Sequence, residues 1–154
     1  MNRWFAALLL GCPFSAHASE LANISTRGKV LTGDDVMIAG FIIQGAGSRT
    51  VVVSVAGPSL AGTGITNLLA NPTLTLVRSS DNTVIATNDD WQRQTFPADV
   101  AAIQASGFQP NDSLEPAIIA TLQPGAYTAI AEGVASGTGV AVIGVFTVST
   151  NTTT

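Results

Sequence analysis

The chain has 154 residues, of which only 10% are charged, with 6 basic and 10 acidic side chains. This is the length of one domain, and the chain contains no run of basic residues, which argues against a nucleic acid or an anionic membrane as partner. Thr, Ser, Asn and Gly must therefore supply most of the surface, as is common in extracellular β modules, and such a surface can self-associate.

The first 18 residues predict an export signal. Arg3 precedes an apolar run over residues 4–10, Pro13 then breaks any helix, and Ala16-His17-Ala18 has the pattern of a signal peptidase site. We expect cleavage after Ala18, so that residues 19–148 form the domain. The apolar run is too short to span a bilayer and no other segment is long enough, so no transmembrane segment is expected.

A second processing route is open. Leu9-Leu10-Gly11-Cys12 resembles a bacterial lipobox, and cleavage before Cys12 would leave a lipid anchor at this cysteine. Pro13 directly after the cysteine is unusual for such sites, so this route ranks second. Both routes predict a bacterial protein that is secreted or held at the cell surface.

Cleavage after Ala18 has a chemical consequence, because His17 and Cys12 are the only histidine and cysteine of the chain. The mature protein would lack a histidine base, a cysteine nucleophile, disulfides, and zinc or copper bound by His or Cys. Its five basic and ten acidic residues give a net charge of −5. We therefore expect a protein that is not an enzyme.

Val, Ile and Thr dominate the rest of the chain, and turn residues recur at short intervals, which predicts an all-β fold. Strands are expected over residues 21–26, 36–44, 49–57, 73–78, 84–87, 116–122, 125–133 and 139–149, with a short helix over residues 96–108. The run over residues 36–44 is nearly all apolar, so we expect it to be buried on both faces. The predicted fold is an antiparallel β-sandwich of about 7–8 strands with one short helix, followed by a disordered tail, residues 149–154.

Several stretches occur in an order that resembles a known family. They are "LANISTRGKVLTGDDVMIAGFIIQG", "VAGPSLA", "NPTLTL", "VIATNDDW", "LEPAIIATLQPGAYTAIAEG" and "TGVAVIGVF". The chain resembles a β-sandwich module that is repeated in large secreted and surface proteins of environmental bacteria. It is also similar in outline to pre-peptidase C-terminal type domains, a resemblance that implies a module without catalytic activity. Pro116 and the ending "TVST" depart from the family's pattern.

Four acids form a candidate metal site. Asp89 and Asp90 follow the strand expected over residues 84–87, while Asp112 and Glu115 precede the strand expected after them. If these two strands lie side by side, the four carboxylates meet, and hard oxygen ligands suit calcium, which is the one candidate cofactor. The alternative is that Asp and Asn form turns and cap backbone groups.

Trp91 is the one tryptophan that remains after export. It could stack on a sugar as a ligand-binding residue, or it could seal the sandwich edge against the helix expected over residues 96–108. The other aromatic residues of the mature chain lie in apolar patterns and are expected in the core: Phe41, Phe96, Phe108, Tyr127 and Phe146.

Three functions follow, in order. The first is a non-enzymatic module for adhesion or assembly through sheet edges and Thr-rich faces, in which residues 19–27 could add a strand to a neighbour. Its partners would be further copies, other surface proteins or polysaccharide. The second is a calcium-stabilised module that binds carbohydrate or another polymer. The third is a small hydrolase that pairs Asp89 or Asp90 with Asp112 or Glu115.

Overall fold

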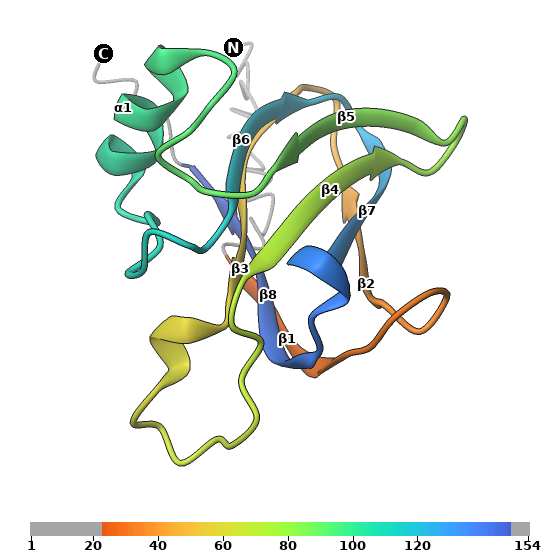
Figure 1. Cartoon of the computed structure of the whole chain (residues 1–154). Coiled ribbons are helices and arrows are strands. Elements are labelled where there is room, and N and C mark those ends of the chain that lie inside the picture. The colour runs from red at the N-terminus through yellow and green to blue at the C-terminus, as the bar shows by residue number, and fades with distance from the viewer. Residues whose placement is uncertain (1–22, 149–154) are drawn as a thin grey trace, which may run out of the picture.

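Eight strands and one α-helix make up residues 23–148, the part of the chain that this computed structural model describes (Figure 1). The strands are β1 (Asn23–Val30), β2 (Met37–Ile43), β3 (Arg49–Ala56), β4 (Pro72–Arg78), β5 (Thr83–Asn88), β6 (Ala117–Leu122), β7 (Gly125–Gly133) and β8 (Gly139–Thr147). The helix α1 spans Pro97–Ser106, and two short 3-10 helices span Pro58–Leu60 and Val134–Ser136. The predicted all-β class is therefore confirmed.

The strands form two sheets of four, which we call sheet A, in the order β1-β8-β3-β6, and sheet B, in the order β2-β7-β4-β5. All six strand pairs are antiparallel, so the predicted antiparallel sandwich is confirmed. Alternate residues point between the sheets because side chains alternate along a strand. Val51, Val53 and Val55 of β3 face Leu74 and Leu76 of β4 in this core, and all five are almost fully buried.

The strands on either side of the four acids are not neighbours in one sheet, and that expectation is wrong. β5 pairs only with β4 at the edge of sheet B, while β6 pairs only with β3 at the edge of sheet A. The second edge of β5 has no strand beside it within residues 23–148, and β6 pairs with β3 in the other sheet. The two strands meet only at their ends, where the Ala117 N–H donates to Asn88 Oδ1 at 3.0 Å.

Strand β2 is buried on one face only, so the prediction of burial on both faces is wrong. Met37, Phe41 and Ile43 point into the core, but Ile38 and Ile42 are 57% and 63% exposed. β2 lies at the edge of sheet B, and within residues 23–148 no helix packs on the outer face of this sheet. The apolar run in the sequence therefore marks an uncovered face.

Helix α1 lies over the outer face of sheet A and builds a second, smaller core (Figure 1). It begins at Pro97 and ends at Gly107, whose left-handed backbone (φ 80°) closes the last turn, as the sequence predicts. The buried residues of this core are Val52, Trp91, Ile103 and Ala117.

The prediction that the aromatic residues lie in the core holds for some of them and fails for Phe96, next to this helix. Phe108 stacks on Phe146 with ring centroids 4.6 Å apart, and Phe41 stacks on Tyr127 inside the sandwich. Phe96, in contrast, is 66% exposed, so the prediction that it lies in the core is wrong. It directly precedes the helix and lies largely in solvent.

The ends of the chain bear on the processing predictions. The signal peptide (residues 1–18), the lipid anchor at Cys12 and the tail (residues 149–154) all lie outside the described residues. Of the segment over residues 19–27, the described part is in β1, which pairs with β8 of the same chain. Between residues 23 and 148, no helix has the length and apolar character needed to cross a membrane.

Candidate functional site

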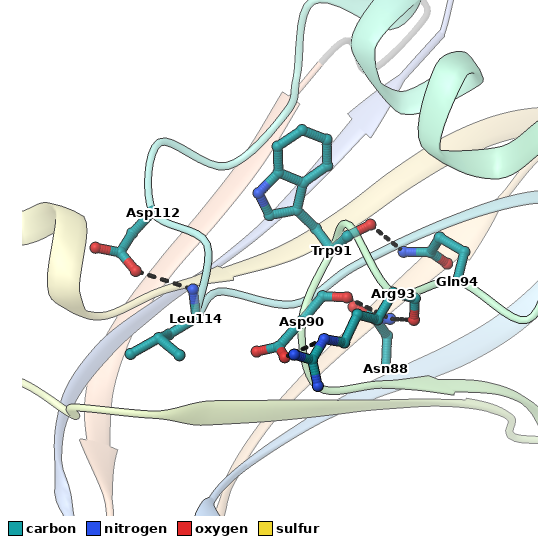
Figure 2. Close-up of polar contacts among 7 residues, drawn as sticks. All are labelled: Asn88, Asp90, Trp91, Arg93, Gln94, Asp112 and Leu114. Carbon is teal, nitrogen blue, oxygen red and sulfur yellow. Dashed lines mark hydrogen bonds and ion pairs between the residues drawn. The ribbon is translucent and has the colours of Figure 1, made fainter. Parts of the chain in front are cut away.

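The turn that follows β5, residues 88–94, holds two of the four acids singled out in the sequence, Asp89 and Asp90, together with Trp91 (Figure 2). Asn88 is its centre, because its side chain is buried and makes three hydrogen bonds. Its Nδ2 donates to the carbonyl oxygens of Asp90 (3.1 Å) and Arg93 (3.2 Å), and its Oδ1 accepts from Ala117 N–H. Asn88 thus folds the turn back on itself and joins the end of sheet B to the start of β6.

Trp91 is held by the same turn. The backbone N–H of Trp91 donates to the Glu115 carbonyl oxygen at 3.0 Å. The backbone carbonyl oxygen of Trp91 accepts from Gln94 Nε2 at 2.8 Å (Figure 2). The residue is only 5% exposed and packs with Ile103 of α1. The indole therefore seals the small core against the helix, which is one of the two roles expected. Ligand binding by Trp91 stays a prediction, and it would require the ring to leave this core.

Glu115 is the most deeply buried of the four acids, with 1% of the residue exposed. Its Oε1 accepts two backbone hydrogen bonds, from Gly57 N–H at 2.8 Å and from Ser59 N–H at 2.9 Å. Hydrogen bonds to an ionised acceptor are shorter and stronger than neutral ones, so two such donors can hold a carboxylate away from water. Glu115 thereby anchors the start of the connection between β3 and β4.

Two of the other three acids have partners of their own. Asp90 forms an ion pair with Arg93 (Oδ2 to Nε 3.5 Å), and Asp112 Oδ1 accepts from the Leu114 N–H at 2.9 Å (Figure 2). Asp89 is exposed. Across residues 23–148, no three His, Cys, Asp or Glu side chains gather closely enough to hold a metal ion. Calcium binding by Asp89, Asp90, Asp112 and Glu115 stays a prediction that this arrangement does not support.

The chemistry available to this turn is structural. Glu115, the carboxylate that a hydrolase would need opposite Asp89 or Asp90, is buried and occupied by two backbone donors. The alternative expected for this region, that Asp and Asn form turns and cap backbone groups, describes Asn88 and Asp112, whereas the role of Glu115 was not predicted from the sequence. The one available signal for Glu115 was an acid directly before Pro116 and an apolar strand, where an unpaired charge is rarely buried.

No family model matches the chain, and no curated protein matches it. Among solved structures, the chain is similar to the pre-peptidase C-terminal domain of collagenase from Bacillus anthracis, with 18% sequence identity and a TM-score of 0.48. The match covers 80% of this chain and 89% of that domain. The fold assignment itself rests on the strand pairing described above.

Proposed function

We propose that this chain is a non-enzymatic β-sandwich module that acts outside the cell or at its surface and assembles with further copies of itself. The observation that carries the proposal is the outer face of sheet B, which we call face B. It is made of the outward residues of β2, β7, β4 and β5, and in the described chain no other element packs on it. The location follows from the export signal expected in the sequence.

Face B exposes apolar side chains in a threonine-rich setting. Ile38, Ile42 and Val84 are 57%, 63% and 56% exposed, and Ile130 lies opposite Ile38 in the register of β2 and β7. The remaining outward positions include four threonines: Thr73, Thr75, Thr87 and Thr128. Exposed apolar groups that share one face commonly mark a site of protein association.

A second copy is the occupant that suits this surface. Face B carries one acid, Glu132, near the end of β7, so a second copy can pack on the apolar part of the face while this carboxylate stays in water at the rim. Two sheets pack face to face about 10 Å apart when apolar side chains interdigitate, as sheets A and B already do inside the molecule. A two-fold axis through the face would pair it with itself and satisfy both copies. The free edge of β2 offers a further row of backbone donors and acceptors.

The non-enzymatic part of the proposal is supported by the turn after β5. Glu115 and Asp112 accept hydrogen bonds from backbone N–H groups, Asp90 is paired with Arg93, and Asp89 is exposed at the surface. General acid or base catalysis needs a group within hydrogen-bond reach of substrate. Glu115 is too deeply buried to offer that.

The test is the mass of the mature protein in solution. Sedimentation velocity over a range of concentrations should show dimers or larger species for the wild type, and the double variant Ile38→Thr/Ile42→Thr should be a monomer. Phe96→Thr removes an equally exposed apolar side chain elsewhere and should leave association unchanged. A wild type that stays monomeric at every concentration, or a control that loses association equally, would contradict the proposal.

A further inference from the structure

A hollow of about 680 Å³ opens beside the edge strand β1, at the end of sheet A far from α1. We call it the β1 groove. Its described lining comes from three segments: residues 27–31 in and after β1, residues 64–67 of the connection between β3 and β4, and residues 138–140 at the start of β8. It lies on the other sheet from face B, so what it does is independent of the assembly proposed above.

The wall formed by the connection is fixed at both ends. Glu115 holds its start through Gly57 and Ser59. Its far end is bound to β8, because Leu69 N–H donates to the Val140 carbonyl (2.9 Å) and Val140 N–H donates to the Asn67 carbonyl (2.7 Å). Residues 67–69 thus take the place beside β8 that β3 leaves when it ends.

The close approach of this wall needs a glycine. Gly139 has a φ of 156°, and a Cβ at this position would collide with the backbone of Leu68 and Leu69. The parallel bridge between Leu68 and Val140 depends on that contact. The groove is therefore built by the fold before any ligand arrives, which lowers the entropy lost on binding.

Two cations stand together on one side of the groove. Arg27 and Lys29 are alternate residues of β1, opposite Val142 and Val140 of β8, so their side chains leave the same face of the sheet roughly 7 Å apart along the strand. Both are exposed, and within residues 23–148 neither forms an ion pair. No acid is found among the described residues that line the groove.

This placement is unusual for the molecule. Residues 23–148 carry five basic side chains, and two of them line one groove, whereas Arg78 and Arg93 are paired with Asp81 and Asp90. The rest of the chain is acidic. A local positive site on an acidic protein attracts an anion at that place and not elsewhere.

The remaining lining offers hydrogen bonds and some apolar contact. Thr66, Asn67 and Thr138 carry hydroxyl or amide groups, and Leu31 and Ile65 are apolar. A hollow of this size is larger than one oxyanion needs. Hydroxyl and amide groups beside short apolar surfaces match the alternating hydroxyl and C–H groups of a sugar. No aromatic side chain is among the described lining residues, so contact with a sugar would depend on these polar groups and on Leu31 and Ile65.

We propose that the β1 groove binds an acidic saccharide. Arg27 and Lys29 hold its anionic group, with Arg27 able to donate in pairs to one carboxylate or sulfate, and Thr66, Asn67 and Thr138 receive the neighbouring hydroxyls. Carboxylate and sulfate present the same oxyanion chemistry.

The binding test uses isothermal titration of the mature protein with tetragalacturonate, a heparin tetrasaccharide and neutral maltotetraose. We expect binding of at least one acidic tetrasaccharide and none of maltotetraose, with affinity that falls as salt rises. The first two probes separate a carboxylate ligand from a sulfate ligand. Loss of at least about tenfold in affinity is expected for Arg27→Gln/Lys29→Gln, because charge-assisted hydrogen bonds are lost.

Arg78→Gln/Arg93→Gln is the matched control, since it removes the same charge far from the groove. It should bind as the wild type does. An unchanged thermal midpoint of the groove variant would show that it folds, since both altered side chains are exposed. The proposal is overturned if neither acidic probe binds, if the control loses as much affinity as the groove variant, or if tetraglutamate or inorganic phosphate binds as tightly as the acidic saccharides.

Discussion

The outer faces of the two sheets both carry apolar side chains, but they differ in solvent exposure. Val52 on the outer face of sheet A is fully buried, whereas Ile42 on face B is 63% exposed. The difference comes from one segment, the turn and helix between β5 and β6, which places Trp91 and Ile103 over Val52. An apolar residue on the outer face of a sheet therefore does not show that the face is buried. Burial requires another segment of the chain, or another molecule, that packs on the face.

The largest effect is expected when the same charge is placed on each face, because the two faces differ in burial. Val52→Lys would bury an ammonium group without a partner, at a free-energy cost of several kcal/mol, and should leave little folded protein. At a protein concentration low enough to keep the molecule monomeric, Ile42→Lys keeps its charge in water and should change the free energy of unfolding by only about 0.5 kcal/mol. Urea unfolding of both variants gives the answer. Equal losses would mean that face B is covered within the monomer.

Removing the cover itself comes next. Trp91→Ala should lower the free energy of unfolding by about 3–5 kcal/mol, because it opens a cavity in the small core above sheet A. Phe96→Ala removes an exposed aromatic five residues further on and should change it by about 0.5 kcal/mol or less. Denaturant unfolding compares the two. A mild effect of Trp91→Ala would favour a ligand-binding role for the indole over a packing role.

Substitutions of Glu115 test how the connection between β3 and β4 is anchored to the sandwich. Glu115→Ala leaves the N–H groups of Gly57 and Ser59 without an acceptor and should cost about 1–3 kcal/mol for each group. Glu115→Gln keeps a carbonyl acceptor and should lose less. Hydrogen exchange at these two amides reads the anchor directly. Unchanged protection in Glu115→Ala would show that the carboxylate does not hold the loop.

The smallest effect is expected at the edge of sheet B, in the hairpin between β4 and β5. The side-chain hydrogen bond from Arg78 holds the pKa of Asp81 well below its usual range. A lowered folded-state pKa stabilises the fold above the unfolded pKa, and this contribution is lost as pH falls through the acid range. Both side chains are solvated, so Asp81→Asn should lower the Tm at pH 7 by about 2 °C or less.

Calorimetry of Asp81→Asn and wild type from pH 7 to pH 2 checks this sign. The difference in Tm should shrink once the pH falls below about 4. High salt should reduce it as well, because exposed ion pairs are screened. A difference that grows toward low pH would contradict the assignment.

Local features of the fold could be predicted from the sequence, and long-range ones could not. The alternation in Gly125–Gly133 and the Pro and Gly that bound α1 gave these elements nearly their full extent. The choice of sheet for β5 and β6 was missed, because either strand could satisfy its hydrogen bonds with several partners. The exposure of β2 and of Phe96 was also missed. It depends on which face of the sandwich the helix covers, and this is a long-range feature too.

The candidate site divides in the same way. The packing of Trp91 against the helix follows from apolar residues close by in the chain. The role of Glu115 depends on the backbone N–H groups of Gly57 and Ser59, more than fifty residues away, and a backbone donor has no letter of its own in a sequence. Arg27 and Lys29 were unremarkable until the register with β8 set them beside the wall of the β1 groove.

The position of β8 has a consequence for the order of folding. In sheet A it lies between β1 and β3, so β1 has no partner there until β8 is present. A chain that emerges from its amino end therefore holds seven strands and an unfinished sheet. Contacts between residues so distant in sequence form slowly. Completion of sheet A therefore waits for β8, the last strand within residues 23–148.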